Sequence, residues 1–138
     1  MLLSHDDIAA AVERPTHVSD ACAHVGPILA RIGEKWSVLV VMTLSVGPYR
    51  FNQLKRMIDG ISQRMLTVTL RALERDGLVS RTQHASIPPR VEYALTELGQ
   101  SLCRPVIALA DWAVDHVDEI NDARQAFDRR AEQEPSVN

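Results

Sequence analysis

The chain has 138 residues, 46% of them hydrophobic, and a formal net charge of −3. This length supports one domain with its own core. No apolar run approaches the roughly 18 residues that a membrane span requires, and acidic residues stand where a signal peptide would be basic, so we expect a cytoplasmic protein without a membrane partner. The two cysteines, Cys22 and Cys103, lack CxxC spacing, and the histidines lack metal-ligand spacing, so neither a disulfide framework nor a metal or cofactor is expected.

Charge is unevenly distributed along the chain. Residues 50–90 contain eight basic and three acidic residues, a net charge of +5, whereas the remaining residues contain seven basic and fifteen acidic ones. A basic segment inside an acidic protein is typical of a nucleic-acid-binding module joined to elements with another role, although a solvated charged face gives the same pattern. The position of these charges on the fold has to decide between the two interpretations.

Turn residues divide the first half of the chain into short helices. Gly26 and Pro27 are expected to open a first helix that Gly33 closes, because proline is tolerated at the first helical position. A second helix is expected over residues 35–45, and its sequence WSVLVVMTL is apolar almost all round, which predicts the most buried helix of the domain. A Gly-Pro pair then stops it, and a few extended residues lead into a short helix in RFNQLKRMI.

The stretch GISQRMLTVTLRALERDGLVSR, residues 60–81, predicts an amphipathic helix with a basic outer face. Ser62 is suited to cap its N-terminus, and Gly77 is suited to end it in the left-handed conformation. At about 100° per residue the leucines gather on one face. The opposite face carries arginines interleaved with small apolar and hydroxyl side chains: Arg64, Thr67, Val68, Arg71 and Arg75.

Two short alternating segments, residues 78–83 and 90–95, predict a β-hairpin whose connection HASIPP should project. Thr96 then caps a long final helix, whose apolar residues recur every three or four positions. A stripe of that length is wider than one small domain easily covers, which favours dimerisation. The residues expected at the dimer interface are Leu98, Leu102, Val106, Leu109, Trp112 and Val117.

This order of elements predicts a winged helix-turn-helix: a mainly α fold with a small β-hairpin wing (α+β) and long N- and C-terminal dimerisation helices. The second helix of such a motif lies in the major groove of double-stranded DNA, where arginine and glutamine can bind base edges and methyl groups can contact thymine. The expected recognition-helix contacts are Ser62, Gln63, Arg64, Thr67, Val68, Arg71 and Arg75. The expected contacts of the DNA backbone or the wing are Lys35, Arg50, Asn52, Gln53, Lys55, His84 and Arg90. Winged helices also serve as protein-interaction modules, in which the same basic face would meet an acidic partner.

Five segments occur in order within residues 22–117: RIGEKWSVLVVMTL, RFNQL, GISQRMLTVTLRALERDGLVSR, PPRVEYALTELGQSL and LADWA. Together they resemble the HxlR-type family of bacterial transcriptional regulators, a branch related to the MarR winged-helix group. The resemblance implies a homodimer formed by the N- and C-terminal helices, with residues 62–76 as the recognition helix and residues 79–95 as the wing. Two recognition helices about 34 Å apart predict a pseudo-palindromic operator.

Several HxlR-type regulators have a cysteine just before the first helix that senses oxidants or electrophiles, and Cys22 resembles it in position. Ala23 stands where the family usually has proline. A thiolate near a helix N-terminus is stabilised by the helix dipole, an effect that protonated His24 would support and Asp20 would oppose. Cys22 is therefore either a redox sensor or a small residue buried at the dimer interface. Cys103 is expected to pack, with pairing across the dimer as the alternative. A small apolar ligand beneath the first and last helices is the alternative signal.

We therefore expect three segments: residues 1–20 as a partly helical N-terminal extension, residues 21–122 as the HxlR-type domain with its dimerisation helices, and residues 123–138 as a helix end and disordered tail. The expected function is sequence-specific regulation of transcription. Repression is favoured over activation because steric occlusion needs no activating surface. The sequence has no phosphate-binding glycine loop and no recognisable catalytic constellation, so an enzyme is not expected.

Overall fold

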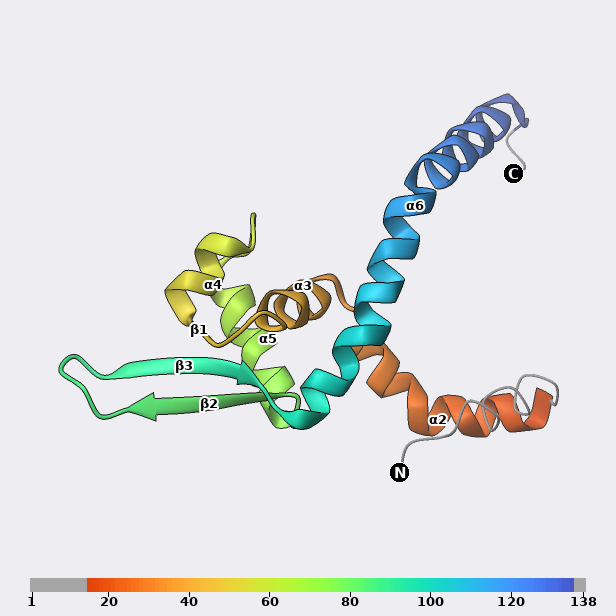
Figure 1. Cartoon of the computed structure of the whole chain (residues 1–138). Helices are drawn as coiled ribbons and strands as arrows, with labels where there is room; N and C mark the ends of the chain where they lie inside the picture. The colour runs from red at the N-terminus through yellow and green to blue at the C-terminus, as the bar shows by residue number, and fades with distance from the viewer. Residues whose placement is uncertain (1–14, 136–138) are drawn as a thin grey trace.

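The computed structural model describes the backbone of residues 15–135 and the side chains of residues 23–135. Its helices are α2 (Pro15–Ile32), α3 (Lys35–Leu44), α4 (Phe51–Met57), α5 (Gln63–Arg75) and α6 (Glu97–Gln133), and its strands are β1 (Tyr49–Arg50), β2 (Val79–His84) and β3 (Arg90–Leu95). Helices α3, α4 and α5 form a body from which the β2–β3 hairpin projects on one side and α2 and α6 on the other (Figure 1). This arrangement confirms the predicted mainly α fold with a β-hairpin wing. Residues 1–14 of the predicted N-terminal extension and residues 136–138 of the predicted tail lie outside the described part.

Helix α2 begins earlier than the Gly-Pro pair indicated. It starts at Pro15, crosses the expected boundary at residue 20 and continues through Pro27 to Ile32. The prediction that Gly26 and Pro27 open this helix is therefore wrong. An internal proline removes one backbone hydrogen bond and can bend a helix, but it does not end one that has helical residues on both sides.

Helix α3 lies at the centre of the core, as its apolar sequence predicted. Glu34 caps it: the carboxylate accepts hydrogen bonds from the Trp36 N–H at 3.1 Å, the Ser37 N–H at 3.0 Å and the Ser37 hydroxyl at 3.1 Å. Burial would raise the pKa of Glu34, but these hydrogen bonds and the nearby Arg31 outweigh it and lower the pKa. The buried core around α3 comprises Val40, Val41, Leu44, Leu54, Ile58, Ile61, Leu66, Leu70, Leu73, Leu78 and Val79.

Helices α4 and α5 follow α3 as the two helices of the helix-turn-helix. Ser62 is the N-cap of α5, as predicted, and its hydroxyl accepts a hydrogen bond from the Met65 N–H at 3.0 Å. Ile61 before the cap and Leu66 after it are both buried, as a hydrophobic staple requires. The start of α5 is therefore specified by residues close to it in the sequence, two of which also pack in the core.

The C-terminal end of α5 is a Schellman motif. Gly77 has a φ of +76°, the left-handed conformation that was predicted for it. Its N–H donates to the Glu74 carbonyl at 3.0 Å, and the Leu78 N–H donates to the Leu73 carbonyl at 2.9 Å. These two bonds satisfy carbonyls that the helix end would otherwise leave unpaired. The chain turns sharply here and enters the sheet.

The sheet has three antiparallel strands in the order β1-β3-β2. The hairpin is paired in register from Val79 opposite Leu95 to His84 opposite Arg90. Val79 is buried against α5, and the exposed strand ends extend beyond the body (Figure 1). The hairpin is therefore anchored at its base and free at its tip.

Helix α6 starts directly against the end of α5. The Thr96 hydroxyl accepts from the Gly99 N–H at 3.1 Å and donates to the Gly77 carbonyl at 2.5 Å, and the Thr96 N–H donates to the Leu78 carbonyl at 3.1 Å. We call these four residues, Gly77, Leu78, Thr96 and Gly99, the α5–α6 junction. Beyond it α6 continues through Pro105 to Gln133, so residues 123–133 of the segment expected as a helix end and tail are helical.

Candidate nucleic-acid interface

The seven residues predicted for the recognition helix all lie on the solvent-exposed side of the structure: Ser62, Gln63, Arg64, Thr67, Val68, Arg71 and Arg75. The opposite face of α5 is buried through Leu66, Leu70 and Leu73. Val68 leaves 53% of its surface exposed beside the arginines, although an apolar side chain gains nothing from solvent. The exposed face of α5 thus combines cationic groups with methyl groups, the mixture that binds phosphates, base edges and thymine.

An open groove of about 570 Å³ runs between α5 and the sheet. Helix α5 contributes Gln63, Thr67, Arg71 and Glu74, and the sheet contributes Arg81 of β2 and Tyr93 of β3, which are paired in register; Phe51 of α4 completes the lining. The groove therefore brings together basic groups that lie ten residues apart in the sequence. Three of the predicted recognition residues line it.

Arg81 was not predicted as a site residue, because the sequence placed it only within the basic segment. The alternation of side chains along β2 could have predicted its position. Arg81 follows the buried Val79 by two positions, so both side chains lie on the face of β2 that packs against α5. Tyr93, its partner across the strand pair, carries no charge and gave no comparable signal.

The residues predicted to contact the DNA backbone from α3, β1 and α4 differ in whether their side chains already have a partner within the protein. The Lys35 ammonium lies 4.4 Å from the centroid of the Trp36 ring, a cation–π contact at the start of α3. The Gln53 side chain accepts the Arg50 N–H at 2.8 Å, so it caps α4. Arg50 is exposed, and so are Asn52 and Lys55.

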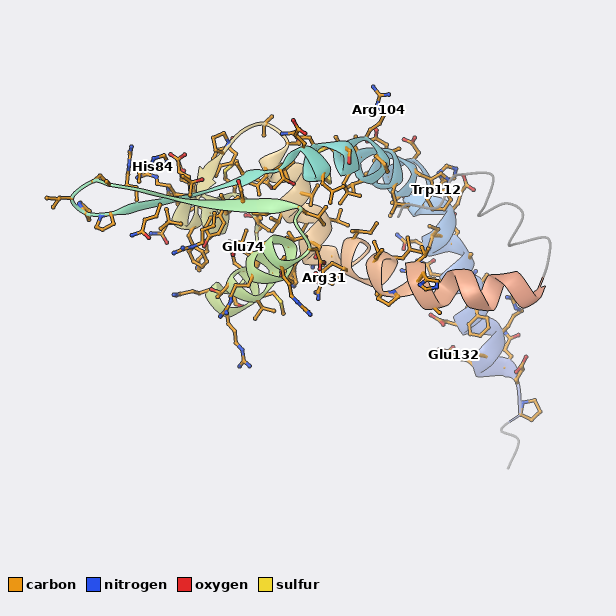
Figure 2. All side chains as sticks on the ribbon, turned by 90° about the horizontal axis from the view of Figure 1, so that it is seen from below. Arg31, Glu74, His84, Arg104, Trp112 and Glu132 are labelled. Atoms are coloured by element: carbon orange, nitrogen blue, oxygen red, sulfur yellow. The ribbon has the colours of Figure 1, made fainter. Side chains whose placement is uncertain are left out.

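The predicted wing residues His84 and Arg90 face each other at the end of the hairpin. The His84 Nε2 lies 3.3 Å from a carboxylate oxygen of Glu92 (labelled His84 in Figure 2). The loop of residues 85–89, which joins His84 to Arg90, contains no charged side chain, and its Ile87 is fully exposed. Positive charge on the wing is therefore concentrated near its base at Arg81 and at its end at Arg90.

The residues predicted at the dimer interface separate into two groups. Val106 is only 4% exposed, and Leu102 is partly buried against the core, so these two pack at least in part within the protomer. The other four leave about half their surface exposed: Leu98, Leu109, Trp112 and Val117. Ile28 and Leu29 of α2 and Phe127 of α6 are similarly exposed. We call these seven side chains the exposed apolar surface.

Cys22 lies within α2, seven residues after the helix begins at Pro15. The expectation that it precedes the first helix is therefore wrong. The Cys22 side chain lies outside the described side chains. Cys103 packs against the core, as predicted, and burial raises the pKa of its thiol.

The described part of the chain offers neither a metal site nor a membrane span. Residues 23–135 contain no group of three side chains that could hold a metal ion. No helix among the described residues is long and apolar enough to cross a membrane. The two candidate interaction surfaces are the exposed basic face of α5 with its groove, on one side of the molecule, and the exposed apolar side chains of α2 and α6.

A family model described as HxlR-like helix-turn-helix matches residues 31–121. The chain belongs to this family. The HxlR relatives include the uncharacterized HTH-type transcriptional regulator YtfH of Escherichia coli strain K12, which is 41% identical over 93 residues, covering 67% of this chain and 74% of YtfH. The solved structure of the redox regulator HypR in its reduced form is 39% identical with a TM-score of 0.66, covering 71% of this chain and 97% of that one. Diamide-treated YodB from Bacillus subtilis is 32% identical with a TM-score of 0.59, covering 65% and 89%.

As a member of the HxlR family, the protein is a transcriptional regulator with a helix-turn-helix DNA-binding fold, and it is not an enzyme. The resemblance drawn from the five sequence segments is thereby confirmed. Among the two interpretations of the basic segment, HxlR membership favours nucleic-acid binding over a charged surface without a partner.

Proposed function

We propose that this protein is a cytoplasmic, homodimeric repressor that binds a pseudo-palindromic operator. The observation that carries the proposal is the shared groove, in which Arg71 of the recognition helix and Arg81 of the wing line one surface. An α-helix fits the major groove, and a basic side chain from the wing beside it would hold the adjacent phosphates.

The residues have different roles in this proposal. Arg64 lies at the second position of α5, and the N-terminal residues of a recognition helix contact base edges, so Arg64 reads sequence by binding guanine O6 and N7. Val68, one turn further along, contacts a thymine methyl group. Arg71 and Arg81 bind phosphate oxygens and fix the register on the duplex.

The exposed apolar surface supports the homodimer. On α6, Leu98, Leu109, Trp112 and Phe127 fall within a strip of about 60° at about 100° per residue. Monomeric proteins rarely leave large apolar side chains gathered on one helix face in water, and a second copy offers the same side chains. A two-fold dimer of this kind places its two α5 helices on successive turns of the DNA, which requires a pseudo-palindromic site.

The decisive experiment selects bound sequences from a random duplex pool and then compares Arg64→Ala with wild type on the enriched site. Loss of one bidentate base contact should cost about 1–3 kcal/mol and relax the preference at one position of each half-site. Arg104→Ala is the matched control, since it removes the same charge from α6, where Arg104 points away from the body (Figure 2). If Arg64→Ala binds the selected site as tightly as Arg104→Ala, the recognition-helix assignment is wrong.

A second proposal concerns the signal: Cys22 is an oxidant-responsive thiol. Two solved structures similar to this chain are a redox regulator in reduced form and a diamide-treated regulator. The chain has only two cysteines, and the raised pKa of Cys103 leaves little thiolate at neutral pH. Diamide should therefore weaken operator binding by wild type and Cys103→Ser equally, whereas Cys22→Ser should be insensitive. Equal sensitivity of Cys22→Ser would exclude Cys22 as the sensor.

A further inference from the structure

The C-terminal end of the recognition helix is tied to both helices that carry the exposed apolar surface. On one side, the α5–α6 junction joins it to α6 through the Thr96 hydroxyl and the Gly77 carbonyl. On the other side, the Arg31 Nε lies 3.4 Å from a carboxylate oxygen of Asp76, the C-cap of α5. Figure 2 shows Arg31 beside the turn that follows α5.

The Arg31–Asp76 pair is placed where α2 leaves the body. Arg31 is in the last turn of α2, and the rest of the helix projects away from α3, α4 and α5 (Figure 1). Ile32 packs against the core, and a two-residue turn then leads into α3. A link between α2 and α5 at this point restrains the direction in which α2 leaves the body, although both side chains are about 40% exposed.

Because α5 is long, a small change of angle at its C-terminal end produces a large displacement of its N-terminal end, which contacts DNA in the proposed function. From Gln63 to Arg75 the helix spans about 18 Å at 1.5 Å per residue. For a helix of this length, a tilt of about 5° around its C-terminal end moves its N-terminal end by about 1.6 Å. Hydrogen bonds tolerate only a few tenths of an ångström, so the tilt of α5 relative to the dimer decides which half-site spacing is read.

We propose that Arg31 and Asp76 are positioning residues that set the angle between the dimer and the recognition helix, and thereby the half-site spacing that the regulator accepts. This inference rests on the proposed homodimer. Neither residue contacts DNA in it. The pair acts by fixing α2 against α5, while the α5–α6 junction fixes α6 against the same turn.

The test measures dissociation constants on duplexes in which the two selected half-sites are separated by the preferred spacing or by one or two base pairs more or less. Arg31→Gln and Asp76→Asn each remove one charge of the pair. Their effects on overall DNA affinity should be opposite, because one variant loses a positive charge and the other a negative charge. Their effects on spacing should be the same: each lowers the discrimination between best and shifted spacing, by at most about fivefold, the range of an exposed ion pair.

The controls separate this role from stability and net charge. Arg31→Gln with Asp76→Asn restores the net charge and should discriminate no worse than either single variant, since the same ion pair is absent from all three. Arg104→Gln should keep wild-type discrimination. Sedimentation and thermal unfolding should show that each variant dimerises and folds as wild type does. Arg31 also helps to lower the pKa of Glu34, so Arg31→Gln can disturb the cap of α3. In that case the conclusion rests on Asp76→Asn.

The possible results are distinct. A preferred spacing in wild type that both single variants discriminate less well supports the inference. A preferred spacing that all variants retain overturns it and leaves the dimeric regulator intact. A wild-type protein without any spacing preference overturns the pseudo-palindromic operator first, and the positioning role fails with it.

Discussion

Gly99 packs directly against the carbonyl of Leu78: a Cβ added at Gly99 would lie 2.1 Å from the Leu78 oxygen. Two non-bonded heavy atoms cannot be this close, so the backbone of Gly99 or Leu78 would have to move. The Leu78 carbonyl is also held by a hydrogen bond from the Thr96 N–H at 3.1 Å. The start of α6 can therefore rest on the end of α5 only because residue 99 has no side chain.

Gly99→Ala should consequently destabilise the protein, although alanine is the better helix former. Overpacking of this kind costs about 1–3 kcal/mol, measured as the free energy of unfolding in urea. Gln100→Ala is the matched control, because Gln100 is exposed on the same helical turn and should leave stability unchanged or slightly raised. Equal stability of the two variants would show that α6 can shift away from Leu78 at no cost.

Arg81→Ala should weaken binding to specific and random duplexes by the same factor, because a phosphate contact carries no sequence information. The slope of log affinity against log salt should become shallower by about 0.9, the value for one phosphate that is no longer neutralised. The measurement is a titration over several salt concentrations. A change of base preference without a change of slope would instead assign Arg81 to base reading.

Trp112→Ala should shift the monomer–dimer equilibrium toward monomer by about 2 kcal/mol or more, since large aromatic side chains dominate interfaces. Trp112 is 53% exposed and stacks on His116 with ring centroids 4.5 Å apart. Val46→Ala, at an even more exposed apolar residue after α3, should leave the equilibrium unchanged. Sedimentation equilibrium of the two variants distinguishes an interface residue from an exposed one.

Glu34→Gln should lower stability at neutral pH, because the charged carboxylate caps α3 and its pKa in the folded protein is lowered from 4.5. The charge contributes to folding above the unfolded-state pKa, and the contribution is lost as the pH falls through the folded-state value. The difference between wild type and variant, of order 1 kcal/mol for an N-cap, should therefore shrink below about pH 4.5. Urea unfolding at pH 7 and at acidic pH measures it.

Local signals were enough to predict α5 and its exposed face. Its cap at Ser62, the buried pair that flanks the cap and the left-handed Gly77 all act within a few residues, so the sequence contains each cause next to its effect. The prediction of where α2 starts was wrong for the opposite reason. A Gly-Pro pair occurs both at helix starts and inside helices, and the choice depends on residues before it.

The apolar stripe of α6 shows a second limit. Periodicity predicted that Val106 and Trp112 lie on apolar positions of one helix, but not that Val106 would be buried in its own protomer while Trp112 stays exposed. That division depends on where α6 docks, which the contact between Gly99 and Leu78 determines. Arg81 needed the same tertiary information, because its neighbour Arg71 belongs to another element.

The wing is closed at its base by the hydrogen bonds of Thr96 to Gly77 and Leu78, far from its open tip. Changes in the loop between His84 and Arg90 are therefore insulated from the recognition helix and from α6. Residues could be inserted, removed or exchanged there without moving either helix, because loop tips tolerate such changes. The hairpin is in this sense an interchangeable part: new operator preferences could evolve, or be engineered, in a few loop residues while the rest of the regulator is kept.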